Sequence, residues 1–442
     1  MDSLNINLVN AFNGVLDNLV DAESYADSPP RGPRELATLS EAEINALELN
    51  ENGESLTKNQ NYNSTTYKNI DINNEDGTSL EGSYLPKLVS LPTSDELDGI
   101  IICGIDGSNQ RVEKNSFCFI LGRAAIVNFK YTKGKEPPYF YTIKKDASAV
   151  TWVDGNIFKE SVIEHTNNKL KKLKEDEGAN VFEYIKQENP KPFLVTYDHL
   201  SSKKSPSSHA LGWAVKFQQA LELLCLAEIK TDANKKTVCI KDGPLFSTSS
   251  SKNDTVEGLR PVIQWNNQVL VCVSKRINDA KLILDTFGSF PELLQIYFPG
   301  DEVTRDSILS IGTDSLLLQR ILKPGHRTPF IKAVPVARIG VCNQLKDDLN
   351  KDFTPLCCYY RGKTRPQTFI RIEIPFFMYE NNKQLIEEAI AVVAWQHELG
   401  GKAPYIQLVA DDLCQLNYEK ELLEKQTLAA LSNKKLELAE QY

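Results

Sequence analysis

The chain has 442 residues, 41% of them hydrophobic, which is enough to bury one large core or two and to leave an extension. No apolar run approaches the roughly 20 residues that cross a bilayer, and the first residues lack the basic-then-apolar pattern of a signal peptide, so we expect a cytoplasmic protein without membrane contact. The net charge of −9 gives no global attraction to nucleic acid, so any DNA binding must come from a local basic patch or from metal ions.

The first 95 residues are predicted to form an extension that is mostly helical or irregular. Apolar side chains recur at helical spacing from Leu4 to Leu19, and a second helix is expected from Leu39 to Leu49. Eight asparagines follow between Asn50 and Asn74, a composition that buries little apolar surface and favours a linker. We therefore divide the chain into an extension, residues 1–95, and a main domain, residues 96–442.

The main domain alternates between short apolar runs typical of strands and longer segments typical of helices, which predicts a mixed α/β fold. Three successive short strands are expected at residues 101–105, 116–121 and 124–129, followed by a charged helix at 161–176. A long helix is expected at residues 209–230. Further strands are expected at 237–240, 268–273 and 405–410, and further helices from 280 and at 418–439.

Asp106 and Asp242 each end a β-branched apolar run and are each followed by glycine. Such a strand end holds a carboxylate rigidly at the edge of a sheet, with little side-chain bulk beside it. A single Asp-Gly pair is more often an ordinary turn, and the duplication is what favours a functional site. Asp411 is expected to repeat this geometry at the end of the strand at residues 405–410.

Glu222 supplies a fourth acid from the apolar segment ALELLCLA of the helix at residues 209–230. A buried carboxylate is costly unless a cation or hydrogen bonds compensate it, and a metal ion would do so. Two alternatives stay open. Glu222 fits equally a solvated stripe with Gln218 and Gln219, and Glu228 is a rival acid on the same helix.

An all-oxygen ligand set of this kind favours manganese or magnesium over zinc. Two such ions about 4 Å apart activate water and stabilise the leaving oxygen in phosphodiester hydrolysis. Other chemistries lack their motifs, because the sequence has no CxxC pair, no Walker A loop and no GxSxG elbow. The nine cysteines lie mostly in apolar segments and are expected to be reduced, buried thiols.

Six sequence elements occur in the order and approximate spacing of the NurA nuclease family: GIDGS, KDGPL, VCVSKR, LKPGHRTPF, RIEIP and AP…VAD. The chain resembles this family over residues 99–425. The resemblance implies an RNase H-like core, a mixed sheet flanked by helices. It also implies a metal-dependent deoxyribonuclease, an exonuclease or an endonuclease, that acts on DNA with a HerA-type hexameric ATPase in DNA repair or antiviral defence.

The resemblance also assigns roles to individual residues. Asp106, Glu222 and Asp242 match the catalytic, metal-binding acids of the family, and Asp411 matches its late metal ligand. Lys275, in VSKR, matches a basic residue that would hold a phosphate and act in catalysis.

Arginines complete the candidate DNA contacts. Arg276 follows Lys275, and Arg327 and Arg371 match two later arginines of the family. Either of these two also fits a structural role, and for Arg371 an ion pair near Glu373 is the alternative. Arg320 and Lys323 would add positive surface.

Two functional hypotheses follow. The first is an active nuclease, a homodimer that caps the ATPase ring, with the apolar stripe of residues 8–19 as the candidate contact. The second is a catalytically inactive NurA-like platform that docks and regulates the ATPase. The presence of all four acids favours the first hypothesis.

Overall fold

The structure is a computed structural model, and it describes most of the chain from Tyr67 to Lys425. The described residues are 67–74, 78–113, 117–131, 133, 141–154, scattered positions between 214 and 229, 235–246, 252–275, 277, 281–300, 303–311, 313–417, 420–421 and 424–425. The helices expected at residues 4–19, 39–49, 161–176 and 418–439 lie partly or wholly outside them. No described helix is both long and apolar enough to span a bilayer.

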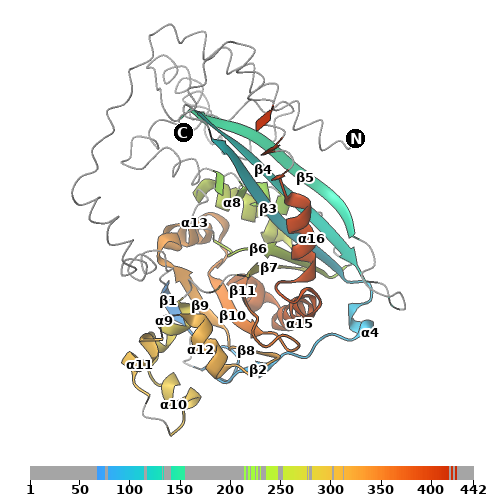
Figure 1. The fold of residues 1–442 in the computed structure, drawn as a ribbon. Coiled ribbons are helices and arrows are strands. Elements are labelled where there is room, and N and C mark those ends of the chain that lie inside the picture. The colour runs from blue at the N-terminus through green and yellow to red at the C-terminus, as the bar shows by residue number, and fades with distance from the viewer. Residues whose placement is uncertain are drawn as a thin grey trace, which may run out of the picture.

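One sheet of 11 strands organises the described residues (Figure 1). In chain order its strands are β1 (Tyr67–Asp71), β2 (Lys87–Leu88), β3 (Ile101–Glu113), β4 (Phe117–Lys130), β5 (Tyr141–Asp154), β6 (Thr237–Asp242), β7 (Gln268–Ser274), β8 (His326–Arg327), β9 (Ile331–Pro335), β10 (Pro355–Arg361) and β11 (Phe369–Pro375). Across the sheet they run β1-β9-β10-β11-β7-β6-β3-β4-β5, with β8 paired to β10 and β2 paired to β8. The mixed α/β class expected from the sequence is confirmed.

Strand direction divides the sheet into two parts. The strands β3, β4 and β5 form an antiparallel meander, and β6 and β7 then add parallel to β3. Beyond β7 every neighbouring pair is antiparallel. The long meander strands reach past the shorter β6 and β7 as one curved ribbon (Figure 1). The ends of the three parallel strands therefore share one edge near the middle of the sheet.

One expectation about the meander was wrong. Residues 116–121 and 124–129 belong to the single strand β4, because Gly122 and Arg123 stay extended and pair with β3 on one side and with β5 on the other. The third strand of the meander is β5, which the sequence analysis had not identified.

Helices cover both faces of the sheet and the end near β1. The described helices are α4 (Ser94–Leu97), α8 (Lys252–Leu259), α9 (Leu282–Ser289), α10 (Leu293–Tyr297), α11 (Arg305–Leu309), α12 (Asp314–Ile321), α13 (Ile339–Leu349), α14 (Phe376–Asn381), α15 (Lys383–Gly400) and α16 (Tyr405–Cys414), with short 3-10 turns at Arg260–Gln264 and Val336–Arg338. The described positions from 214 to 226 are also helical, as expected.

Gly104 and Gly107 of β3 show which helices lie on which face. A Cβ on Gly104 would come within 2.8 Å of Ile406 in α16, whereas one on Gly107 would come within 2.8 Å of Glu222. Because side chains alternate along a strand, these two positions point to opposite faces. Helix α16 therefore covers one face of β3, and the helical segment at 214–226 covers the other.

The segment from Tyr67 to Val89 is bound into the main domain, although the sequence analysis assigned it to the extension. Strand β1 pairs with β9, and Tyr297 and Tyr379 donate hydrogen bonds to the carbonyl oxygens of Tyr84 and Leu80. The folded unit thus begins at or before Tyr67. The placement of residues 1–66 stays a prediction.

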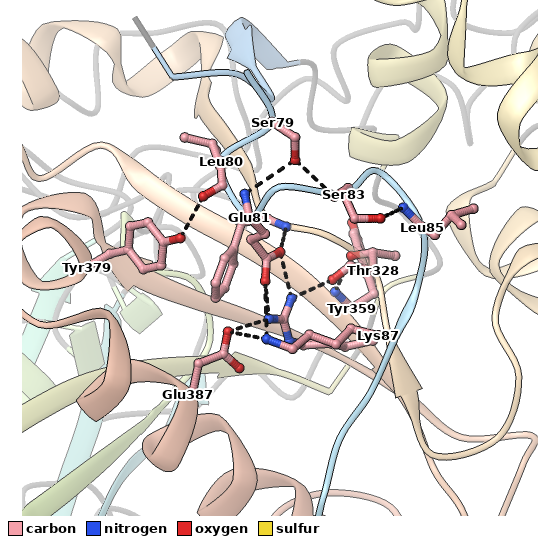
Figure 2. Close-up of polar contacts among 12 residues, drawn as sticks. Ser79, Leu80, Glu81, Ser83, Leu85, Lys87, Thr328, Tyr359, Tyr379 and Glu387 are labelled. Carbon is pink, nitrogen blue, oxygen red and sulfur yellow. Dashed lines mark hydrogen bonds and ion pairs between the residues drawn. The ribbon is translucent and has the colours of Figure 1, made fainter. Parts of the chain in front are cut away.

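Glu81 anchors this segment to the domain (Figure 2). Its carboxylate accepts hydrogen bonds from both terminal nitrogens of Arg327 and, at 2.7 Å, from the amide of Phe330. Arg327 also pairs with Glu387 of α15 at 2.7 Å, and its side chain is 1% exposed. The segment thus supplies a charge that the buried guanidinium requires.

We expect Glu81→Gln to destabilise the protein by roughly 3–5 kcal/mol, because it leaves a buried guanidinium short of one countercharge. Urea unfolding measures the change. Lys87→Gln is the matched control, since Lys87 pairs with the same two acids but has a 54% exposed side chain. Its cost should stay below about 1 kcal/mol. Equal losses in the two variants would contradict the role given to Glu81.

Candidate active site at the edge of the parallel strands

The pairing of β3 with β6 brings Asp106 and Asp242 side by side. Ile105 lies opposite Lys241 in the parallel register, so the next residues, Asp106 and Asp242, are neighbours on the same face. Asp106 is 1% exposed. Burial, reinforced by the charge of Asp242, raises the pKa of Asp106 well above its usual value. Asp242 ends β6, as expected, but the strand end expected at Asp106 was wrong, because Asp106 and Gly107 stay extended and paired with β4, and β3 runs on to Glu113. Only the pairing of β3 with β6 stops just before Asp106, and this places the two carboxylates together.

Lys275 brings a positive charge between the two aspartates. It follows β7, which pairs in parallel with β6 and places Val273 opposite Asp242. Its ammonium nitrogen lies 3.1 Å from Asp106 Oδ2 and 3.2 Å from Asp242 Oδ1. Burial lowers the pKa of Lys275, but the two carboxylates outweigh it and raise the pKa above its usual value. Lys275 is thus a fixed cation at this edge.

Glu222 approaches the same edge from the opposite face. It is 4% exposed, so the solvated-stripe alternative is wrong. Its carboxylate accepts from Gln218 Nε2 at 2.8 Å and pairs with Lys241 Nζ at 2.8 Å. The absence of a side chain on Gly107 makes room for it, because a Cβ there would lie 2.8 Å from Glu222 Oε1. Its charge raises the pKa of both Asp106 and Asp242. Glu228 lies outside the described residues.

The sequence analysis missed Lys241, and it placed Gln218 beside Glu222 only as part of a solvated stripe. Lys241 is 5% exposed and donates to the carbonyl oxygen of Asp242 at 2.6 Å while pairing with Glu222. Gln218 donates to both Glu222 and the Gly107 carbonyl, each at 2.8 Å. A signal was present for Lys241, because a lysine directly before Asp242 in a strand must point to the opposite face of the sheet.

The geometry expected for Asp411 was wrong, although its proximity to the site was not. Residues 405–410 form the start of helix α16, so Asp411 is an exposed helical residue instead of a strand end. Its charge contributes to the raised pKa of Lys275. The helix is fixed against the site, because Gln407 Nε2 donates to the Val273 carbonyl and Cys414 Sγ lies 3.1 Å from the Asp106 carbonyl.

Two of the three arginines proposed as DNA contacts are buried and held by protein groups. Arg276 is outside the described residues. Arg327 is 0% exposed and held by Glu81 and Glu387, so it has a structural role. Arg371 is 7% exposed, pairs with Glu373 at 2.8 Å and donates to the Tyr67 hydroxyl at 2.5 Å. The ion-pair alternative therefore describes Arg371, and neither buried guanidinium is available to a phosphate.

The chemistry of the site fits a hard divalent cation. All of its acidic donors are carboxylate oxygens, and Asp242 Oδ1, although ion-paired with Lys275, has no hydrogen-bond donor among the described residues. The pKa of Asp242 is raised by burial, against the influence of Lys275. Within the described part of the chain, however, no three His, Cys, Asp or Glu side chains already form a metal-binding group. The acids therefore suit such an ion by their ligand type and charge, but their side chains are not arranged as a complete set of metal ligands.

Comparison with known proteins identifies one family. The model described as the NurA domain matches residues 100–413. No curated protein sequence matches the chain. The solved NurA nuclease from Sulfolobus solfataricus is 10% identical, with a TM-score of 0.37 over 88% of this chain and 97% of that one. A NurA structure with manganese is 12% identical, with a TM-score of 0.34 over 88% and 98%. A NurA structure bound to dAMP and manganese is also 12% identical, with a TM-score of 0.34 over 90% and 97%.

Proposed function

The chain belongs to the NurA family, and from this premise we propose that it is a divalent-metal-dependent nuclease that hydrolyses phosphodiester bonds in DNA. One observation carries the proposal: two neighbouring carboxylates, the buried Asp106 and the half-buried Asp242, share the ammonium of Lys275 at the edge of the parallel strands. Phosphoryl-transfer sites require this combination, because anionic ligands hold the cation and a separate positive charge receives the phosphate.

Asp106, Asp242 and Glu222, with Asp411 beside them, are the residues that would hold manganese or magnesium, in a site for two ions. Such ions activate a water and stabilise the leaving oxygen. Lys275 would position the scissile phosphate, since it is already fixed against Asp106 and is 24% exposed. Lys241 and Gln218 orient Glu222 from the opposite face. Cofactor, ion number and the roles of these side chains are proposals.

We further propose that the catalytic core is RNase H-like. The strand order supports it: β5, β4, β3, β6 and β7 run in the order third, second, first, fourth, fifth. Only the second of these strands is antiparallel to the first, and the fourth and fifth are parallel to it. Asp242 lies at the end of the fourth strand, and Asp106 lies beside it where the first strand stops pairing with the fourth; an open sheet of this kind places its ligand site at such strand ends.

A HerA-type hexameric ATPase is the proposed partner, with a homodimer of this chain capping it in repair or antiviral defence. The family assignment supports the partner, and so does the sequence, which has no Walker A motif of its own and carries a net charge of −9. A protein of this charge does not attract DNA over long distances, so a motor that delivers DNA would compensate.

We expect Asp106→Asn to abolish manganese-dependent digestion of a linear duplex while leaving the fold and DNA binding intact. The fold should survive because burial already disfavours the charged form of Asp106, so that a neutral side chain of the same shape costs little. Asp412→Asn is the control, an exposed acid next to Asp411 on the same helix. Digestion by Asp106→Asn at the wild-type rate would remove the proposed active site. A wild type that is inactive with manganese and with the ATPase would favour the inactive platform.

Lys275→Ala should slow cleavage roughly 10²-fold or more, the range for losing one preorganised charge that stabilises the transition state. Lys275→Arg should recover only part of the rate, because a planar guanidinium does not replace a compact ammonium. Single-turnover rates at saturating manganese measure both. Lys236→Ala is the control, an exposed lysine at the opposite end of β6 whose ion pair is with Glu388. If Lys275→Ala and Lys236→Ala cut equally well, Lys275 does not act on the phosphate.

Deletion of residues 1–20 should convert the dimer into a monomer and weaken binding to the ATPase, if the apolar stripe of residues 8–19 makes these contacts. Mass measurement in solution and pull-down with the ATPase provide the two readings. A truncated protein that remains dimeric and still binds the ATPase would reject this role of the stripe.

A further inference from the structure

The hairpin that joins β10 to β11, residues 361–368, lies at the same edge of the sheet as the candidate active site. Strand β11 is antiparallel to β7, and Arg371 lies opposite Ser274. The start of β11 is therefore beside the end of β7, where Lys275 emerges. Arg361 lies opposite Phe369, so the hairpin closes at this edge. Strand β7 is thus followed along the edge first by this hairpin and then by β8.

The hairpin and its neighbours carry exposed positive charge. Lys363 and Arg365 are exposed on the hairpin, and Lys323 and Lys402 are exposed beside it. Among the described residues, none of these four cations forms a salt bridge. The segments that carry these cations are in contact with the hairpin. The amide of Gly325 donates to the Arg361 carbonyl at 2.9 Å, and Gly401 packs against the Arg365 guanidinium. A chain with a net charge of −9 thus presents a local positive surface here.

The hairpin is also held rigidly, by Glu398 at the end of α15. This carboxylate accepts hydrogen bonds from the amides of Lys363 and Thr364, at 2.7 and 2.8 Å, and from the hydroxyl groups of Thr364 and Tyr360. The carboxylate of Glu398 is therefore occupied by backbone amides and hydroxyl groups. Partial burial raises the pKa of Glu398, but these hydrogen bonds outweigh the effect of burial and lower the pKa below its usual value.

Two further contacts fix the basic side chains. Gly401 has a positive φ of 79°, and a Cβ there would lie 1.9 Å from Arg365 Nη1, so this glycine forms a seat for the guanidinium. Gly325, in the turn that follows Lys323, lies against Lys363, with 3.5 Å between the position of its missing Cβ and Lys363 Cβ. A backbone held by these hydrogen bonds and contacts has little conformational entropy to lose when a polyanion binds to the exposed cations that it carries.

We propose that Lys363 and Arg365, with Lys323 and Lys402 beside them, form a docking surface for the phosphate backbone of DNA. This inference rests on the proposed nuclease function and extends it, because it states where the duplex lies when one of its phosphates is at Lys275. The surface contacts phosphates outside the scissile bond, so it holds long DNA without reading its sequence.

The double variant Lys363→Ala/Arg365→Ala tests the proposal in the Asp106→Asn background, where binding is measured without cleavage. Anisotropy of a labelled 30-base-pair duplex should show roughly 10- to 100-fold weaker binding near 0.1 M salt. The slope of log K against log salt should become shallower by about 2, which is about 0.9 for each lost phosphate contact. The matched control is Lys133→Ala/Lys236→Ala, which removes two exposed lysines near the opposite ends of β3 and β6.

Cleavage in the wild-type background separates this surface from the active site. The double variant should cut the duplex more slowly but hydrolyse a single-nucleotide ester, thymidine 5′-p-nitrophenyl phosphate, at the wild-type rate, because that substrate is too short to reach the hairpin. An unchanged salt slope and duplex affinity would overturn the proposal and leave the surface to an acidic protein partner. If the wild type cuts neither substrate and the hairpin still determines DNA binding, the proposed docking surface stands and the nuclease function fails.

Discussion

The parallel pairing of β3, β6 and β7 is the constraint on which the rest of the site depends. Its register sets Asp106 beside Asp242 and directs Lys275 to both of them. Bringing carboxylates together in a buried place is unfavourable, and the raised pKa values of both aspartates reflect that cost. Two lysines offset part of this cost. Lys275 pairs with the aspartates on one face of the sheet, and Lys241 pairs with Glu222 on the other. The ion pairs of Lys275 and of Lys241 thus lie on opposite faces of the sheet, at the same edge.

The two aspartates could be singled out because the apolar run before each of them and the glycine after it are local in sequence. The strand end was predicted correctly for Asp242 but not for Asp106, because the pairing of β3 with β4 carries the strand on to Glu113. The same local logic failed at residues 405–410, where an apolar run of this length is compatible with a strand or a helix. The buried side chains Ile406, Ala410 and Cys414 recur every fourth residue, and this helical spacing becomes visible only when the window extends past Asp411. Lys241 was not identified because, in the same strand, the Asp-Gly pair that follows it was the only feature that suggested a functional site. Alternation along that strand would have predicted its partner.

The fate of the arginines depends on distant residues and could not be read locally. Arg327 is buried because Glu81, 246 positions earlier, covers it, and Arg371 is buried with Tyr67, 304 positions earlier. Sequence motifs identified both as conspicuous cations but carried no information about these partners. Exposed positive charge lies instead on the hairpin after β10, where the carboxylate of Glu398 is occupied by backbone amides. Charge is therefore divided along one edge of the sheet, with acids at its centre and, to one side, cations that form no salt bridge with a described residue.

The attachment of the segment around Glu81 also affects how the protein is made. Tyr67 and Glu81 leave the ribosome before their partners Arg327, Arg371 and Glu387, which are synthesised 246 to 306 residues later. At roughly 5–20 residues per second, that delay is of the order of tens of seconds. During this interval β1 has no strand to pair with, because β9 does not yet exist. The pairing of β1 must wait for β9, so the sheet is not completed strand by strand in chain order.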